Sequence, residues 1–329
     1  MNLTDALNRI SHAVGDGKLV WQQAYVYHDD RSLNATDGKQ WARIATDHMV
    51  PFCVRYDALK MALKRDGATV AAAPGYGLKV TAGRSRTTIQ GLDPETWPQM
   101  QRDASVRPTT FVEPPDEFKS VLADLAPFMG RQDNHVWQSG VHLTPDYAFV
   151  SNPFAMVRRQ WEWQHGLTGT IPAWAVEFVT AQAELFTNMT FNNSVVVFAW
   201  PDILLSASLL VEEPPEAAQM MAGGLPTEGG VPVPDNLSDA VNRLASLGAK
   251  TFILGDGKIV YNSEPDNNGR VEIEFEEDID LDGPAQRWGL APFQAALRHA
   301  TSLDFSQPAR CVWHGEGYDG VFAGMGGGR

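Results

Sequence analysis

The sequence is poor in cysteine, with only Cys53 and Cys311 among its 329 residues. One widely separated pair provides neither the disulfide framework of a small secreted domain nor the closely spaced ligands of a structural zinc site. No apolar run approaches the roughly 20 residues that a membrane-spanning helix requires. The first 15 residues carry Asp5 and Arg9, where a secretory leader would be apolar. We therefore expect a cytoplasmic protein that does not depend on disulfides.

The motifs of several common enzyme classes are also missing, since the sequence has no P-loop, no GxSxG and no HExxH. The most metal-like clusters are His28-Asp29-Asp30 and His314-Gly315-Glu316, but neighbouring side chains on an extended segment point to opposite sides. The acidic run over residues 272–282 lacks the ligand spacing of a calcium-binding EF-hand and favours an acidic outer strand. The sequence thus predicts no catalytic residue, no metal and no cofactor.

Basic residues are outnumbered, and the net charge of −14 argues against a nucleic-acid partner if the chain is taken as a whole. The distribution is uneven, however. Residues 1–100 carry 12 basic and 10 acidic residues, whereas residues 201–329 carry 8 and 20. An acidic exterior with a local basic face is compatible with this distribution.

An internal repeat organises the chain. Three extended apolar segments, at Phe52, Ile171 and Trp288, each lead into a short amphipathic helix, and another amphipathic helix precedes each of them. The expected helices begin near Thr4, Asp57, Pro115, Ala175, Asn236 and Ala291, and runs of β-prone residues lie between and after them. Linkers near residues 105 and 225 are rich in polar residues, glycine and proline. We predict three modules, residues 1–105, 106–222 and 223–329.

The hairpin sequence LKVTAGRSRTTIQ over residues 78–90 and its Trp97-Pro98 exit resemble the end of the first domain of the bacterial DNA polymerase III β subunit, the sliding clamp. Residues 35–38, ATDG, are similar to a turn of the same family, and the repeat of about 117 residues matches its three-domain plan. The resemblance covers almost the whole chain. The sequence is short and divergent for a cellular clamp, and a phage- or plasmid-encoded member would account for that.

This resemblance implies an α+β fold of three repeated clamp modules, each with two helices packed on antiparallel sheets. Two chains would join head to tail in a ring that encircles duplex DNA, without chemistry, and tethers a polymerase. The basic side chains on the predicted helices are consistent with that role, because sliding depends on diffuse attraction to phosphates. The residues that we expect to face DNA, including two at the hairpin, are Arg9, His12, Lys60, Lys64, Arg65, Arg84, Arg86, Lys119, Arg131, Arg243, Gln294, Arg298 and His299.

The family also binds short linear peptides of polymerases and clamp loaders in an apolar pocket between its second and third domains. The matching turn here, SNPFAM over residues 151–156, lacks the His-Arg pair of the family, and Gln219 replaces an arginine. Methionine and phenylalanine suit an adaptable peptide groove. The resemblance assigns to this pocket Gln138, Ser151, Pro153, Phe154, Ala155, Met156, Pro215, Gln219, Met220, Val321, Ala323 and Met325.

The same residues can also be explained without a binding function. A pair of lysines on a helix is usually only a solvated face, and the pocket residues could equally be ordinary core. A ring or scaffold protein built from the same repeats, without DNA, is the alternative to a sliding clamp. Retention on circular but not on linear DNA would separate the two functions.

Overall fold

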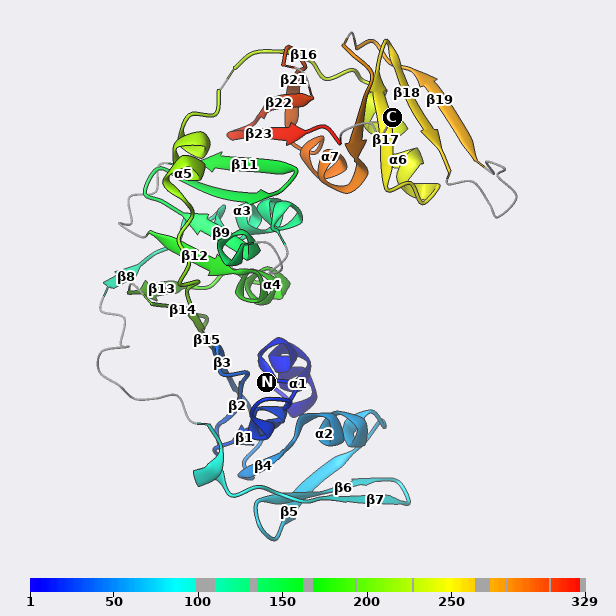
Figure 1. Cartoon of the computed structure of the whole chain (residues 1–329). Helices are drawn as coiled ribbons and strands as arrows, with labels where there is room; N and C mark the ends of the chain where they lie inside the picture. The colour runs from blue at the N-terminus through cyan, green and yellow to red at the C-terminus, as the bar shows by residue number, and fades with distance from the viewer. Residues whose placement is uncertain are drawn as a thin grey trace. The chain divides into compact units, whose positions relative to one another are not determined.

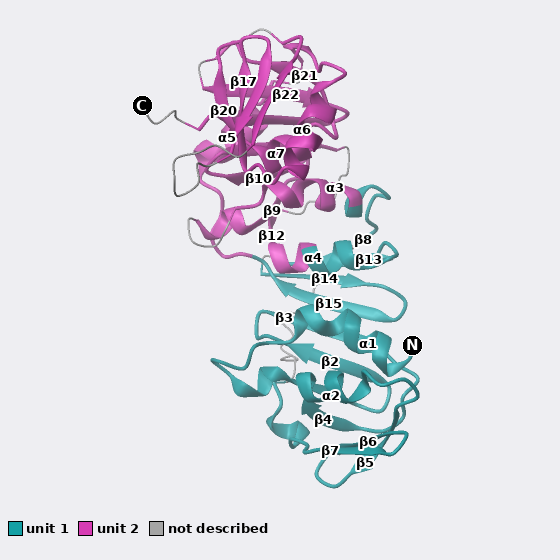
Figure 2. Cartoon of the chain, turned by 90° about the vertical axis from the view of Figure 1, so that its right-hand side faces the viewer, with its two compact units in different colours: residues 1–119, 177–209 teal, residues 120–176, 210–329 magenta. Residues whose placement is uncertain are grey.

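The computed structural model describes residues 1–98, 110–130, 135–161, 168–192, 194–226, 228–263, 273–281, 283–307 and 309–325. The chain forms two compact units, residues 1–119 with 177–209 and residues 120–176 with 210–329 (Figure 2). Both units combine helices with antiparallel sheets, so the predicted α+β class is confirmed. In the described part of the chain, no helix has the length and apolar character needed to cross a membrane.

The six amphipathic helices expected from the sequence are all present (Figure 1). They are α1 (Leu3–Ile10), α2 (Tyr56–Leu63), α3 (Phe118–Leu125), α4 (Ala173–Ala181), α6 (Leu237–Ser246) and α7 (Leu290–Ala296). Helix α1 begins at Leu3, one residue before the start signal at Thr4, because its N-cap is Asn2, whose side-chain oxygen accepts a hydrogen bond from the Asp5 N–H at 2.9 Å. A seventh helix, α5 (Glu216–Gly223), was not predicted and follows Pro215.

The predicted repeat of an extended segment followed by a helix occurs three times in the structure. Strand β4 (Phe52–Arg55) runs directly into α2, β12 (Gly169–Pro172) into α4, and β20 (Gln286–Gly289) into α7. Each strand is hydrogen-bonded in an antiparallel sheet, so the helix that follows starts from a fixed position. The division into three modules stays a prediction.

Unit 1 contains an eight-stranded sheet, sheet A, in the order β4-β1-β2-β3-β15-β14-β13-β8, and a three-stranded sheet, sheet B, in the order β5-β6-β7. In sheet A, β3 pairs with β15, so that strands from the first and second predicted modules form one ladder. The remaining strands of the unit are β1 (Tyr25–His28), β2 (Ser32–Thr36), β3 (Gln40–Ala45), β5 (Thr69–Ala73), β6 (Gly77–Ala82), β7 (Ser85–Ile89), β8 (Thr110–Val112), β13 (Asn188–Phe191), β14 (Val195–Ala199) and β15 (Ile203–Ser208).

Unit 2 repeats this plan with the eight-stranded sheet C, in the order β12-β9-β10-β11-β23-β22-β21-β16, and the four-stranded sheet D, in the order β19-β18-β17-β20. Here β11 pairs with β23, which again joins two predicted modules. The strands are β9 (Gly140–Leu143), β10 (Tyr147–Asn152), β11 (Ala155–Gln160), β16 (Val231–Pro232), β17 (Thr251–Gly255), β18 (Lys258–Asn262), β19 (Glu274–Asp278), β21 (Ala300–Asp304), β22 (Arg310–Gly315) and β23 (Tyr318–Ala323).

The two faces of sheet C are covered by different helices. On one face, Phe322 of β23 lies 5.5 Å from Phe293 of α7, between ring centroids. On the other face, Met156 and Val321 pack with Ala222 of α5 in a buried apolar cluster. Figure 1 shows α5 on the side of this sheet opposite α3 and α7. The predicted pocket residues Met156 and Val321 therefore lie on the α5 side, whereas Ala155, the cross-strand partner of Phe322, lies on the α7 side.

Two buried histidines should make the fold sensitive to acid. His28 and His142 are 0% and 2% exposed, and desolvation lowers the pKa of each from 6.5 to about 4. The unfolded chain binds a proton to each below pH 6.5, whereas the folded chain does so only near pH 4. Stability is therefore present above pH 6.5 and lost as the pH falls toward 4.

We expect the free energy of unfolding in urea to fall by about 2 kcal/mol per buried histidine between pH 7 and pH 5. The variants H28Q and H142Q should each make this dependence shallower, while H12Q, at an exposed histidine, should leave it unchanged. Equal pH dependence in all three variants would contradict the assignment.

Candidate nucleic-acid interface and peptide-binding pocket

Helix α2 carries Lys60 and ends just before Lys64, whereas Arg65 lies with Ala58, Met61 and Ala62 on the side that faces sheet B. Tyr56 and Leu59 are buried, while Lys64 and Arg65 are exposed. The Lys60 Nζ donates a hydrogen bond to the Tyr56 hydroxyl at 2.9 Å and lies over the same ring. The lysine stem is thereby held along the helix with its charge toward solvent.

Helix α1 and the turn after it carry two further predicted residues. Arg9 is exposed in the last turn of α1, and His12 is exposed in the short 3-10 helix that follows (Ser11–Ala13). The His12 carbonyl accepts a hydrogen bond from the Gln40 side chain at 2.7 Å, which fixes this turn on β3. Both side chains remain available to an external anion.

Lys119 on α3 has an internal partner that the sequence did not reveal. Its Nζ donates hydrogen bonds to the carbonyls of Gln182 and Ala183, just after the end of α4. A lysine in this position stabilises the unpaired carbonyls of a helix C-terminus. We therefore assign Lys119 a structural contact. Arg131, the other predicted base of this module, lies outside the described residues.

The predicted residues of α6 and α7 are also largely engaged by neighbours. Arg243 donates to both carboxylate oxygens of Glu277, at 2.6 and 2.5 Å, and Gln294 donates to Asn242 at 2.8 Å. His299 lies 3.3 Å from Asp124. Helix α7 ends at Ala296, so Arg298 and His299 lie in the turn after it and not on its surface as predicted. Of this group, Arg243 and Arg298 are exposed, while Gln294 and His299 are half-buried.

The predicted arginine hairpin is present, with Gly83 and Arg84 as the two turn residues between β6 and β7. Gly83 has φ +58°, which suits the type of two-residue turn that begins with glycine. Arg84 lies at the tip. Arg86 lies on β7 opposite Thr81, on the face of sheet B that points away from α2.

The other face of sheet B forms an open apolar groove of about 350 Å³ with α2. Three of the groove-lining residues on α2 are Ala58, Met61 and Ala62, and Met61 is 70% exposed. The strands contribute Val80 and Ala82. The short side chains of α2 leave this groove unfilled.

In unit 2, the predicted peptide pocket has a buried floor. Met156 on β11 and Val321 on β23 are direct cross-strand partners, and both are at most 8% exposed. They belong to one apolar cluster with Trp137, Phe149, Ala222, Leu225 and Val312, against which Tyr147 and Ala218 pack. Two residues predicted for the pocket therefore lie side by side. The other cluster members were not predicted, although Phe149 and Val312 lie on the β-prone runs that became β10 and β22.

Exposed apolar side chains lie close in sequence to members of this cluster. Phe154, in the turn between β10 and β11, is 50% exposed, and its carbonyl accepts a hydrogen bond from the Ala323 N–H at 2.7 Å. Met220 and Met221 on α5 are 70% and 42% exposed. Adjacent exposed methionines are a common feature of surfaces that bind varied apolar partners.

The other predicted pocket residues have diverse positions. Pro153 and Pro215 are exposed in turns, Ala155 is buried, and the Gln219 side chain donates to the Pro214 carbonyl at 2.8 Å. Gln138 and Ser151 are both buried beside Gly130. Met325 pairs its backbone with Arg287 at the edge of β20.

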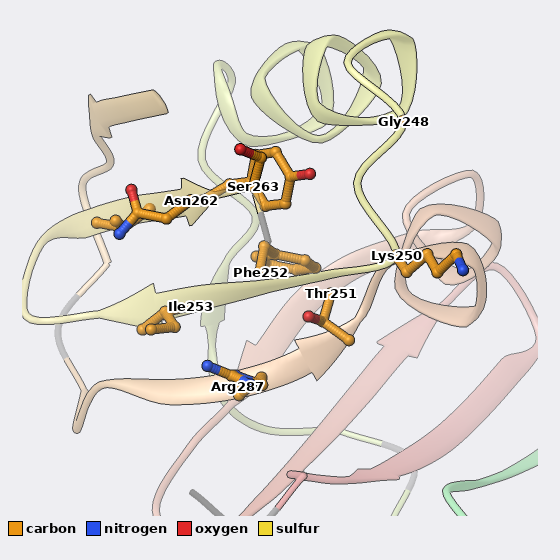
Figure 3. Close-up of a pocket in the computed structure, with 10 residues that line it drawn as sticks. Gly248, Lys250, Thr251, Phe252, Ile253, Asn262, Ser263 and Arg287 are labelled. Carbon is orange, nitrogen blue, oxygen red and sulfur yellow. The ribbon is translucent and has the colours of Figure 1, made fainter. Parts of the chain in front are cut away.

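A separate cavity of about 600 Å³ lies where β17 and β18 diverge beyond their last paired residues, Ile253 and Val260 (Figure 3). Lys250 and Arg287 line it, together with Phe252, Tyr261 and Asn262. Among the residues that the structure describes, none of those predicted to face DNA or to form the pocket lines this cavity.

No protein-family model matches the sequence, and no curated protein does. Solved structures do match, over 98% of this chain and 97% of theirs. A Helicobacter pylori β clamp bound to a DNA ligase peptide has a TM-score of 0.74 at 12% identity. The DNA polymerase sliding clamps of Caulobacter crescentus and Bacillus subtilis have TM-scores of 0.71 and 0.72 at 16% and 11% identity. These likenesses show the fold.

Proposed function

Because the chain has the bacterial sliding-clamp fold, we propose that it is a non-catalytic DNA sliding clamp of the cytoplasm. Two copies close a ring around duplex DNA, and the ring tethers replication proteins. The observation that carries this proposal is the likeness to sliding clamps over 98% of the chain. Electron microscopy of the purified protein should reveal closed rings with a central hole, and open or compact particles would oppose the proposal.

The DNA-facing surface of this clamp is formed by basic side chains on and beside the helices. We assign Lys60 and Lys64 to it, together with Arg9, His12 and Arg298, whereas Arg65 lines the groove between α2 and sheet B. Lys119, Arg243, Gln294 and His299 support the helices through their internal partners. Few phosphate contacts are then available, which suits a ring that holds DNA by enclosure and slides freely.

The homodimer forms head to tail through two open sheet edges. In the described part of the chain, β7 and β19 each pair with a single neighbour, β6 and β18. Arg86 and Lys79 lie on the face of sheet B away from α2. Glu274, Glu276 and Asp278 lie on the face of sheet D away from Phe275 and Glu277, which contact Arg243 of α6.

Joining β7 of one copy to β19 of the other continues the sheet and keeps the helices of both copies on one side. The basic and acidic side chains then meet on the opposite side, which fixes the orientation of the partner. Arg84 extends this basic edge, and we place Arg84 and Arg86 here and not at DNA. Leu247, 39% exposed one turn after Arg243 on α6, is an apolar group suited to the groove beside α2 of the partner.

Client proteins bind the apolar surface formed by Phe154, Met220 and Met221 above the Met156–Val321 floor. The H. pylori clamp with a bound DNA ligase peptide supports this assignment by analogy of fold. The altered 151–156 turn has no basic side chain, so the peptide is held here mainly by apolar contacts.

Replacing Met220 with aspartate should weaken binding of that DNA ligase peptide at least tenfold, because a carboxylate would be desolvated against the apolar floor. Fluorescence anisotropy of the labelled peptide measures the effect. Met49→Asp is the matched control, since Met49 is 73% exposed in unit 1. Equal binding by wild type and M220D would contradict the pocket assignment.

A ring or scaffold that does not hold DNA is the second candidate. Two observations favour it. Several basic residues predicted to face DNA, Arg243 and Lys119 among them, bind internal partners, and the net charge is −14. Such a protein would form the same dimer and show no dependence on DNA topology.

A further inference from the structure

A buried arginine interrupts the apolar α5 side of sheet C. Arg158 on β11 is 3% exposed and lies on the same face as Met156, two residues earlier. Its cross-strand neighbours are Phe149 on β10 and Asp319 on β23. The charged group therefore lies on the same face of sheet C as Met156 and Val321, one cross-strand row of side chains away.

The guanidinium group of Arg158 is occupied mainly by backbone carbonyls of the segment that ends α5. Nη1 donates to the carbonyls of Ala222 and Gly223 at 2.9 and 2.8 Å, and Nη2 donates to Leu225 at 2.9 Å. Nη2 also donates to Asp319 at 2.6 Å. The last carbonyls of a helix lack intrahelical donors, and this one side chain donates to two of them, Ala222 and Gly223, and to the Leu225 carbonyl just after α5.

Asp319 holds the arginine in place from the opposite side. It accepts a further hydrogen bond from Gln160 at 3.2 Å, and its other oxygen lies 3.1 Å from Nδ1 of His314, which is 5% exposed. Three segments are joined in this way: β11, the end of α5, and the β22–β23 pair. The cluster formed by Arg158, Asp319 and His314 is called the latch below.

A buried ion pair by itself is weak evidence of stability, because apolar residues of similar volume often replace one without loss. The carbonyl contacts are different, since they need several donors in the planar, forked arrangement that only arginine has. A lysine would keep the charge opposite Asp319 but could not reach three carbonyls together. The contacts of the latch therefore fix the end of α5 relative to β11.

We infer that the latch holds α5 on sheet C and thereby positions Met220 and Met221 for client peptides, so that Arg158 is a positioning residue of the pocket. The inference rests on the peptide-binding part of the proposed function. In the described part of the chain, α5 also accepts a long hydrogen bond from sheet C, at 3.3 Å, from the Tyr147 hydroxyl to the Gln219 carbonyl. Ala222 and Leu225 supply the apolar contacts.

Hydrogen exchange followed by mass spectrometry on the full-length protein tests the latch. In R158K, amides of residues 216–226 should exchange at least tenfold faster than in wild type, while those of β22 and β23 stay within about twofold. R158M should loosen α5 as strongly, and R158K keeps the test open if R158M does not fold. R159M is the matched control, because Arg159 is adjacent and on the opposite face of β11. Unchanged exchange of α5 in R158K would overturn the inference.

The double variant R158M/D319M separates positioning from charge pairing. It should recover much of the thermal stability lost in R158M, yet keep fast exchange in α5 and bind the DNA ligase peptide at least tenfold more weakly than wild type. Recovery of slow exchange and peptide binding together with stability would reduce the latch to an ordinary ion pair. If wild type does not bind the peptide at all, the proposed peptide site fails, and the exchange data alone decide whether α5 is latched.

Discussion

Changing Lys60, Lys64 and Arg298 together to glutamate should weaken the binding of duplex DNA at low salt by at least tenfold. The change removes three positive charges per chain and introduces three negative ones, and the attraction to phosphates depends steeply on the number of cations in contact. The slope of log affinity against log salt concentration should also become shallower. Fluorescence anisotropy with a labelled duplex, titrated with salt, measures both quantities.

A matched variant controls for net charge. Lys39, Lys250 and Arg310 are exposed on turns and a strand, outside the helices, and K39E/K250E/R310E makes the same change in total charge. Its affinity for DNA should stay within about twofold of wild type. Equal loss in the two variants would mean that net charge acts, and that the helices do not form the DNA-facing surface.

Reversing the charges of either sheet edge should convert the dimer into monomers. R84E/R86E places negative charge opposite Glu274 and Glu276, and E274R/E276R places positive charge opposite the arginines. Like charges directly opposite each other across a strand pair are destabilising, and several occur at once. Light scattering should give about 36.1 kDa for each variant, where wild type gives twice that mass.

A head-to-tail interface makes one further requirement, because each chain contributes a different edge to each of the two contacts. Mixing the two monomeric variants should therefore restore a dimer, in which one contact has both edges reversed and the other has both edges native. An interface that used the same surface on both chains would not be rescued by mixing. E213R/E228R, at two exposed acids outside β19, should remain dimeric. Failure of the mixture to dimerise would contradict the edge pairing.

The local structure of this chain could be predicted largely from its sequence. Apolar residues at three- and four-residue spacing, such as Leu237, Ala240, Val241 and Leu244, are all buried on α6. The alternation around Val80 gave the β6–β7 hairpin. Such patterns are local, because the period of the chain decides which side chains share a face. Helix α5 was missed since its apolar side covers only a short stretch and its two exposed methionines blur the pattern.

Partners that are distant in the sequence could not be predicted. Lys119 is occupied by carbonyls 63 and 64 residues away, and Arg243 by Glu277, 34 residues away. The pairing of β3 with β15 and of β11 with β23 is equally remote, and it places the floor of the pocket. Arg158 gave no clear signal, because the β11 sequence AMVRRQ does not alternate and its first four residues are all buried. Which segment it would bind depended on the tertiary fold.

Retention on DNA of defined topology is the most direct test of encirclement. Salt that screens the proposed edge contacts should open the dimer, and lowering the salt in the presence of a nicked circular plasmid should close it around the DNA. We predict that protein then co-elutes with the circle in gel filtration and is released when a single-site nuclease linearises the plasmid. Equal retention on circular and linear DNA, or no retention on the circle by a protein that is fully dimeric, would contradict the sliding-clamp account.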